Sequence, residues 1–291
     1  MNKVASALST LFSQRNRTAV ILAFIIHYSS SLINPTFAQS PYALNTGRET
    51  TLLGVGAISL GASVALGHAI DPLTAIEIAT LNRNDINAFD RQAIDHWSTT
   101  AARLSDATLA GSVGVAVVLA AGTKPMRQDF KTVGIMYVET MLLANGIERS
   151  VKGITQRTRP YVYNPDVPLE KKLDRDSRES FFSGHATNAF ASAVFAGEVF
   201  GQYFPHSSWK PVIWVGSLGL ATATAVLRYE GGKHYPTDLL AGAAFGSLVG
   251  WGIPKLHEVK NRSDIGRRLD LQPWSSGSAN GIYLRLLVFS R

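Results

Sequence analysis

Long apolar stretches alternate with short polar connections along most of the chain. Six of them are close to the ~20 residues that an α-helix needs to cross a bilayer, and they run over residues 52–70, 105–122, 131–150, 186–204, 211–228 and 238–254. Ala and Leu dominate them, and none shows the strict alternation of apolar and polar positions that is typical of a strand. The pattern therefore predicts an all-α protein, a membrane-embedded bundle of about six apolar helices.

Two segments depart from this pattern. Residues 73–103 mix apolar side chains with Asp, Glu and Arg, which predicts an amphipathic helical excursion on the surface of the bundle or of the membrane. Residues 281–289 read Gly-Ile-Tyr-Leu-Arg-Leu-Leu-Val-Phe, which is compatible with a short strand or with a segment that adheres to the membrane. We assign no function to this tail.

The first 38 residues have the features of a secretory signal peptide. Basic residues precede the apolar run 19–26, and Thr36-Phe37-Ala38 then supplies the small residues that signal peptidase requires. We expect cleavage after Ala38, with an uncleaved anchor helix as the alternative.

The composition supports a membrane protein and excludes other classes. Charged residues make up only 17% of the chain, against about a quarter in a soluble protein. The apolar segments are rich in small residues, which allow membrane helices to pack closely, although a soluble Ala-rich bundle has a similar composition. The net charge of +7 comes without a nucleic-acid motif, and the absence of cysteine excludes disulfides and thiolate metal sites.

Three polar clusters stand at the ends of apolar segments. They are Lys152-Gly-Ile-Thr-Gln-Arg-Thr-Arg159-Pro160, Phe182-Ser183-Gly184-His185 and Arg228-Tyr-Glu-Gly-Gly-Lys-His234-Tyr-Pro-Thr-Asp238. Arg matches phosphate oxygens with a planar fork and Lys adds a point charge, so Lys152, Arg159 and Arg228 are candidate phosphate ligands. Ser183 and Gly184 stand at the expected start of a helix, where free backbone N–H groups favour an anion.

The histidines and the carboxylate of these clusters are suited to group transfer. Asp238 lies four residues after His234, and from a helix start its carboxylate can turn back to a ring nitrogen of that histidine. Such a bond fixes the tautomer and raises the basicity of the other nitrogen, which makes the ring a nucleophile. His185 is then left to protonate the leaving oxygen and later to activate water.

The order and spacing of the clusters closely resemble the motifs of the type 2 phosphatidic acid phosphatase superfamily, which also contains soluble bacterial acid phosphatases and vanadium haloperoxidases. The resemblance covers about residues 90–254, and the stretch 87–93 with Ser105-Asp106 resembles the region before the second helix of bacterial members. Phe182 replaces the usual Pro, and Leu227 replaces the usual Ser. Neither change removes a charged or nucleophilic group, so we expect activity to survive both.

The resemblance implies an all-helical fold and hydrolysis of a phosphate monoester or diphosphate through a phosphohistidine, without a metal or a cofactor. By motif position, Lys152, Arg159 and Arg228 bind phosphate, with Ser183 and Gly184 assisting; His185 is the acid/base, His234 the nucleophile and Asp238 its orienting partner. The chain then divides into a signal peptide (1–38), apolar and amphipathic segments (39–89), a phosphatase-like catalytic domain (90–256) and a basic tail (257–291).

Four further polar residues lie inside the third and fourth apolar segments: Glu139, Asn145, Glu148 and Glu198. Such groups are costly in a membrane and are often functional. We expect Glu139 to pair inside the bundle and Glu148 to lie near the membrane interface, and we assign none of the four to the site.

The helix order places all three motifs on one side of the bundle. The loop 123–131 on the other side is basic, as is the tail after 254, and positive loops stay in the cytoplasm. The site is therefore expected to face the periplasm from the bacterial inner membrane. Cleavage of the signal would leave the mature N-terminus outside the cytoplasm. Six spans with the site facing the periplasm require that N-terminus inside. Because residues 52–70 contain four glycines, we expect this segment not to cross.

The leading hypothesis is a phosphatase of a membrane lipid: a polyprenyl diphosphate, phosphatidate, phosphatidylglycerol phosphate or a lipid A phosphate. Its predicted partners are the phosphorylated lipid and the membrane, without nucleic acid, and no signal for an oligomeric state is present. The alternatives are a soluble periplasmic nonspecific acid phosphatase, a lipid phosphotransferase, a haloperoxidase and a non-catalytic membrane protein.

Overall fold

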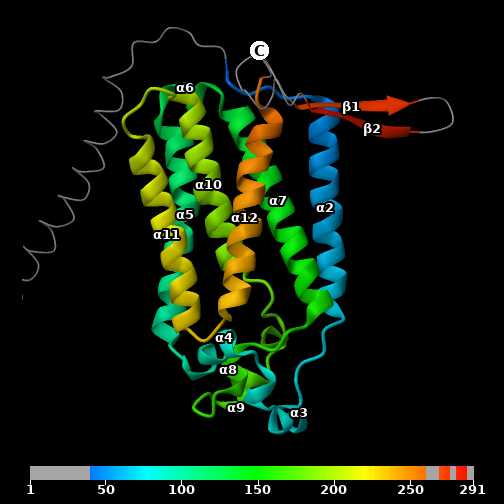
Figure 1. Ribbon diagram of the computed structural model, residues 1–291, viewed down its shortest axis with the longest axis vertical. Helices are drawn as coiled ribbons and strands as arrows, with labels where there is room; N and C mark the ends of the chain where they lie inside the picture. The colour runs from blue at the N-terminus through cyan, green and yellow to red at the C-terminus, as the bar shows by residue number, and fades with distance from the viewer. Residues whose placement is uncertain (1–39, 260–268, 276–279, 287–291) are drawn as a thin grey trace, which may run out of the picture.

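Six long helices stand side by side in the computed structural model of the protein, which describes residues 40–259, 269–275 and 280–286 (Figure 1). They are α2 (Thr46–His68), α5 (Thr99–Gly122), α7 (Phe130–Thr155), α10 (Gly184–Tyr203), α11 (Lys210–Glu230) and α12 (Pro236–His257). Each overlaps one predicted apolar segment, so the all-α bundle is confirmed. The predicted signal peptide and the basic run 260–268 lie outside the described residues.

Four of the long helices, α2, α5, α11 and α12, have the length and apolar character of membrane spans. They expose large apolar side chains, such as Ile58 and Val215, which suit a lipid environment better than water. The protein is therefore a membrane protein. α2 is one of the four, so its length and composition do not support the expectation that residues 52–70 fail to cross. Apolar residues outweigh its glycines, and Gly56 packs closely against Leu142 of α7.

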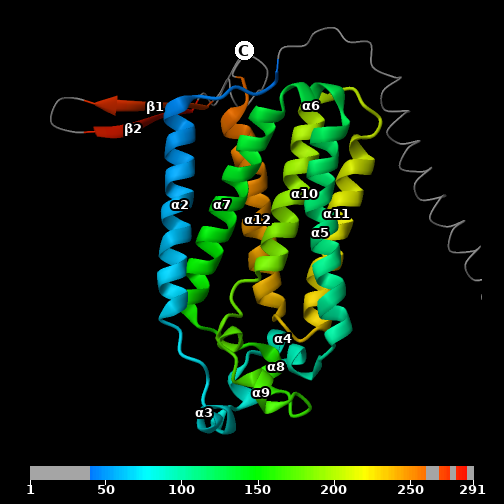
Figure 2. The same cartoon turned by 180° about the vertical axis from the view of Figure 1, so that it is seen from behind.

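Short helices form a cap over one end of the bundle, at the bottom of Figures 1 and 2. The cap consists of α3 (Ala75–Thr80), η1 (Arg83–Asp85), α4 (Ala88–Arg91), η2 (Gln92–Asp95), α8 (Pro160–Tyr163), α9 (Leu169–Lys172) and η3 (Arg175–Arg178). The predicted helical excursion over 73–103 is confirmed, but as a series of short helices. Side-chain caps start several of them anew, such as Thr74 for α3 and Asn87 for α4.

The opposite end of the bundle, called the α6 end here, carries α6 (Lys124–Gln128) and an antiparallel hairpin of β1 (Leu269–Ser275) and β2 (Asn280–Leu286) (Figure 1). Gln272 pairs with Tyr283 in the register. The strand that the sequence offered for residues 281–289 is found over Asn280–Leu286. Its partner β1 was not predicted, because Asp270 and Pro273 are residue types that are depleted in strands.

Small residues on α12 bring its start against the start of α10. A Cβ atom at Gly242, Gly246 or Gly250 would overlap a backbone carbonyl oxygen of α10 or of its N-cap residue, so the two helices approach as closely as their backbones allow. At the cap end of this contact, the Ser183 amide donates to the Asp238 carbonyl at 3.1 Å. The second and third motifs are thereby joined.

We expect Gly246→Ala to lower the melting temperature by about 3–10 °C, because the new methyl group forces α12 away from the Thr187 carbonyl. Gly252→Ala on the same helix is the matched control, since nothing lies within 4 Å of a Cβ there and Ala favours a helix. Its melting temperature should stay unchanged or rise. Thermal unfolding in detergent measures both, and equal values would contradict this packing.

Candidate active site

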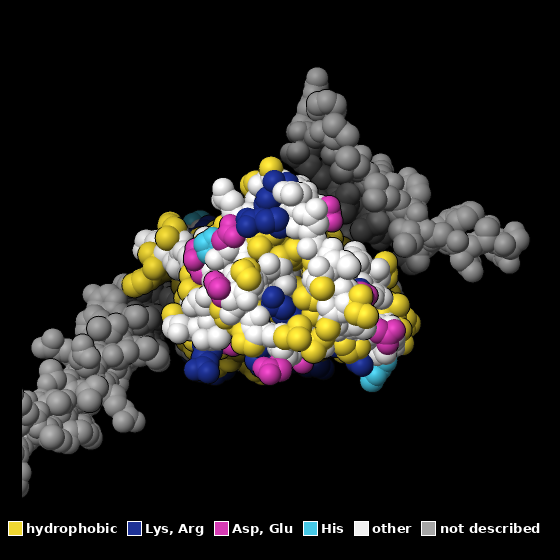
Figure 3. Space-filling view, turned by 90° about the horizontal axis from the view of Figure 1, so that it is seen from below, with side chains coloured by type: hydrophobic (Ala, Val, Ile, Leu, Met, Phe, Trp, Pro, Cys, Tyr) yellow, Lys and Arg dark blue, Asp and Glu magenta, His cyan; other side chains and the backbone are white. Residues whose placement is uncertain are grey.

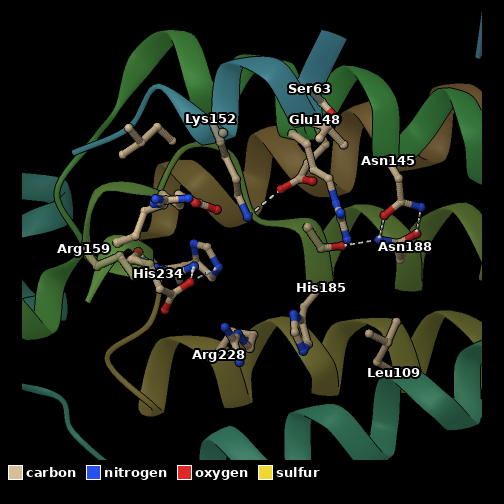
Figure 4. A pocket seen from close by; sticks show the side chains of 18 of the residues that line it. Ser63, Leu109, Asn145, Glu148, Lys152, Arg159, His185, Asn188, Arg228 and His234 are labelled. Atoms are coloured by element: carbon tan, nitrogen blue, oxygen red, sulfur yellow. Dashed lines mark hydrogen bonds and ion pairs between the residues drawn. The ribbon is translucent and has the colours of Figure 1, made fainter. Parts of the chain in front are cut away.

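A cavity of about 640 Å³ lies where the three motifs meet. It is lined by six of the predicted residues: Lys152, Arg159, Gly184, His185, Arg228 and His234. They come from α7, the N-cap of α8, α10, α11 and the loop before α12, and the five side chains other than glycine face a common space (Figure 4). Viewed from the cap end, a cationic side chain shows at the centre of the surface, ringed mostly by uncharged and hydrophobic ones (Figure 3). The other two predicted residues, Ser183 and Asp238, are buried behind this space.

The His234 ring is held in the form of a nucleophile. Its Nδ1 lies 2.8 Å from the Ser180 carbonyl; because a carbonyl only accepts, Nδ1 carries the proton and Nε2 keeps a lone pair. Nε2 lies 3.3 Å from Nη1 of Arg159. Burial, reinforced by the charges of Arg159 and Arg228, holds the pKa of His234 well below its usual value. The ring is therefore neutral where an ordinary histidine would be protonated.

Asp238 acts on this ring less directly than its spacing suggests. Its Oδ2 lies 3.6 Å from Nδ1 of His234, which is too long for a hydrogen bond. The same oxygen accepts from the Ser180 hydroxyl at 2.5 Å and from the Tyr235 amide at 2.9 Å. Asp238 therefore fixes Ser180, whose carbonyl orients the ring. The direct hydrogen bond from His234 to Asp238 that the sequence predicted is absent from the structure.

A buried ionic network holds Asp238 in turn. Arg157 bridges Asp238 at 2.5 Å and Asp90 of the cap at 2.8 Å. The Thr237 amide and hydroxyl donate to Asp90 at 3.0 and 2.6 Å. Although burial opposes it, hydrogen bonds from Thr237 and Arg157 lower the pKa of Asp90. The network ties the start of α12 to the cap through charge-assisted hydrogen bonds.

The three predicted phosphate ligands differ in the hydrogen bonds and ion pairs that they already make within the protein. Arg159 donates to the Asp176 carbonyl at 2.7 Å and to its carboxylate at 2.6 Å, and Lys152 pairs with Glu148 at 2.6 Å. Arg228 is 7% exposed, its Nε has no partner among the described residues, and its Nη1 lies 3.5 Å from the Ser105 hydroxyl. A buried donor without a partner is costly, and an anion in the cavity would satisfy it.

The start of α10 contributes Gly184 to the cavity but not the Ser183 side chain. The Ser183 hydroxyl accepts from the Ala186 amide at 3.3 Å and caps the helix. A Cβ at Gly184 would lie 2.8 Å from Oε1 of Glu148, so glycine leaves room for the carboxylate that pairs with Lys152. Glu148 itself lines the cavity, so the expectation that it only lies near the membrane interface is incomplete.

His185 has a partner that the sequence analysis did not assign. Its Nε2 lies 2.7 Å from Oδ1 of Asp106 on α5. A carboxylate in this position stabilises the imidazolium and orients the ring, as an acid/base residue requires.

We expect Asp106→Asn to lower kcat/KM about tenfold on a lipid phosphate, because His185 loses its counter-charge. On an aryl phosphate, whose leaving group needs no proton, the loss in kcat/KM should stay below about threefold. Steady-state kinetics on both substrates gives the comparison, with Asp166→Asn, an exposed position in the 161–182 linker, as the control. An equal loss on both substrates would point to a merely structural role.

Sequence reasoning missed the residues that hold the predicted ones in place: Asp90, Asp106, Arg157, Asp176 and Ser180. The sequence could have pointed to three of them. Arg157 lies inside the first motif, and Asp90 and Asp106 lie in the stretches that carry the family resemblance. Asp176 and Ser180 lie in the linker 161–182, where no spacing marks them.

The family match covers much of this region. Residues 134–262 match the PAP2 superfamily, so the chain contains a PAP2 superfamily domain. The match includes all eight predicted site residues and ends just beyond α12.

Three curated relatives are named as phosphatases. The probable diacylglycerol pyrophosphate phosphatase 1 of Schizosaccharomyces pombe is 29% identical over 38% of this chain and 46% of its own. The decaprenylphosphoryl-5-phosphoribose phosphatase of Mycobacterium tuberculosis is 32% identical over 37% of this chain and 52% of its own. The lipid A 4'-phosphatase of Porphyromonas gingivalis is 23% identical over 55% of this chain and 66% of its own. The chain thus spans about half the length of the first two relatives.

Among solved structures, the transmembrane PAP2 type phosphatidylglycerolphosphate phosphatase from Bacillus subtilis is 21% identical to this chain. The alignment covers 72% of this chain and 94% of the other, with a TM-score of 0.42.

Proposed function

We propose that the protein hydrolyses a phosphate monoester or diphosphate of a membrane lipid through a phosphohistidine on His234. The Nε2 lone pair attacks phosphorus, and the bond to the lipid oxygen breaks as that oxygen takes a proton from His185. His185 then removes a proton from water, which attacks the phosphohistidine and releases inorganic phosphate. Lys152, Arg159 and Arg228 meet the charge on the phosphoryl oxygens, and the reaction needs no metal or cofactor.

One observation carries this proposal: a neutral, oriented His234 presents its lone pair beside Arg159, in a cavity that also contains the unsatisfied Arg228. A buried nucleophile next to unsatisfied guanidinium N–H groups is suited to an anionic, electrophilic substrate. A phosphoryl group has both properties.

The place of the cavity supports a lipid as the substrate. Ser63, Val64 and Gly67 of α2 line it, so it borders a helix with the character of a membrane span. The relatives named above act on diacylglycerol pyrophosphate, decaprenylphosphoryl-5-phosphoribose and lipid A. We extend the list for this chain to polyprenyl diphosphates, phosphatidate and phosphatidylglycerol phosphate.

The distribution of charge supports an orientation in the bacterial inner membrane with the site facing the periplasm. Lys124 and Arg127 of α6 lie at the end of the bundle opposite the site, and basic loops stay in the cytoplasm. α2 begins at that same end (Figure 1). With α2 as a span, cleavage after Ala38 and a periplasmic site are incompatible, and one of the two expectations must fail.

The test is phosphate release by the full chain in detergent, with EDTA, from a panel of those lipids and a soluble aryl phosphate. We expect release from at least one lipid, lost in His234→Ala and retained in His206→Ala, an exposed histidine of the loop before α11. Release only from the aryl phosphate would favour a nonspecific phosphatase. Transfer to an added alcohol without release would favour a phosphotransferase, and no reaction by the folded protein would overturn the proposal.

A further inference from the structure

Three side chains of types that can bind a metal ion meet in the core at the α6 end of the bundle, away from the active site. Glu49 comes from the first turns of α2, Glu139 from α7 and His257 from the last turn of α12. Glu139 and His257 are fully buried, and Glu49 is 8% exposed. Since α12 separates His257 from His234 along its whole length, the cluster lies about 30 Å from the nucleophile.

The ligand atoms of this cluster converge without hydrogen bonds between them. Nε2 of His257 lies 2.9 Å from Oε1 of Glu49 and 3.2 Å from Oε2 of Glu139. Yet Nε2 and both oxygens of Glu139 have no hydrogen-bond partner in the described part of the chain. These contacts are short, but neither oxygen lies along the direction in which a proton on Nε2 would point.

The tautomer of His257 fits a ligand. Its Nδ1 lies 2.8 Å from the Ile253 carbonyl, so Nδ1 carries the proton and Nε2 keeps its lone pair beside the two carboxylates. A hydrogen bond from the second ring nitrogen to a backbone carbonyl is the usual support of a metal-binding histidine.

The spacing of the ligand atoms also fits a coordinated cation. With metal–ligand bonds of about 2.0–2.2 Å, neighbouring ligand atoms in octahedral or tetrahedral sites lie about 2.8–3.6 Å apart. The separations of 2.9 and 3.2 Å from His257 to the two carboxylates lie in this range. Three ligands from three helices of a bundle, all projecting inward, are a known way to build such a site.

The charge of the cluster favours a cation as well. Two carboxylates lie together in the core, and among the described residues Arg48 is the cation that contacts them, through Glu49 at 2.8 and 3.0 Å. Glu139 has no such contact within those residues. An unpaired buried carboxylate is costly, and a divalent ion between the ligands removes that cost.

We propose that Glu49, Glu139 and His257 bind one divalent first-row metal ion of the Zn²⁺ or Mn²⁺ class, which ties α2 to α7 and α12. One imidazole and two carboxylates suit these ions. The ion has a structural role, because its distance from His234 leaves it outside the proposed reaction. It joins α2 to the helices that carry the first and third motifs.

The test measures metal in the full chain, purified in detergent without chelator and without metal-affinity chromatography. After equilibration with Zn²⁺ or Mn²⁺ and removal of free metal, we expect about one equivalent per chain by mass spectrometry. Glu139→Gln, which keeps the size of the side chain, should bind less than about a tenth of that. Glu198→Gln is the matched control, since Glu198 is a carboxylate on α10 that pairs with Lys255 instead.

Thermal unfolding gives a second readout that does not depend on the variant's folding. EDTA should lower the melting temperature of the wild-type protein by about 5 °C or more, and the added metal should restore it. Folded wild-type protein that neither retains either metal nor responds to EDTA would overturn the proposal. So would a Glu139→Gln variant that binds as the wild type does. Neither result would bear on phosphate release by His234.

Discussion

Replacing Arg228 by Ala is expected to lower kcat/KM for phosphate release by about 10²–10³, the usual cost of removing a positioned donor from a transition-state charge. Arg228 is the predicted phosphate ligand whose charge the protein leaves least compensated. Arg228→Lys keeps the charge but loses the planar fork, so it should recover only part of the activity. Steady-state kinetics on the preferred lipid measures both variants.

The stability of the Arg228 variant provides an independent check. Without phosphate, Arg228→Ala should unfold at the same temperature as the wild type or higher, because a buried and unsatisfied donor is removed. Added inorganic phosphate should raise the melting temperature of the wild type but not of the variant. Arg83→Ala, an exposed cap residue paired with Asp95, serves as the control. Activity within threefold of the wild type, or unchanged protection by phosphate, would contradict the role of Arg228.

Replacing His185 by Asn is expected to lower kcat on a lipid phosphate by about 10²–10⁴, the range for loss of a general acid. A lipid alkoxide is a poor leaving group and needs the proton that His185 supplies. An aryl oxide leaves without it, so formation of the phosphohistidine from an aryl phosphate should fall much less. Hydrolysis of the intermediate still needs His185 as a base, and the intermediate should therefore accumulate in the variant.

Pre-steady-state kinetics separates the two steps of the His185 variant. With an aryl phosphate, we expect a burst of about one equivalent of phenol per active site, followed by slow turnover. Asp106→Asn should show a weaker form of the same behaviour, since it acts through the same ring. No burst, with equal losses on both substrates, would remove His185 from the acid/base role.

Much of the bundle and of the site could be predicted from the sequence, because both depend on local patterns. Length and apolar composition locate a membrane helix. The motifs sit at helix ends, so helix order alone brings Lys152, His185 and His234 to one end of the bundle. The glycines of α2 were taken as evidence against a membrane span, whereas Gly56 allows close packing against α7.

The rest depends on contacts that no local pattern encodes. The four-residue spacing placed Asp238 near His234, but the Ser180 carbonyl takes the ring proton, and Ser180 arrives from a linker without a motif. Glu139 was expected to pair inside the bundle. The two side chains that it meets there, Glu49 and His257, lie on two other helices, so only the tertiary structure brings the three together.

If the phosphoryl group passes through His234, the phosphorylated intermediate can be trapped on that side chain. The full-length protein would be mixed with lipid substrate carrying a radiolabelled phosphoryl group, quenched in alkali within the first turnovers, and mapped by peptide. We expect label on His234 that is stable in alkali and lost in acid, as a phosphoramidate is, and absent from His234→Ala. Label on another side chain, or turnover by His234→Ala at the wild-type rate, would contradict the account.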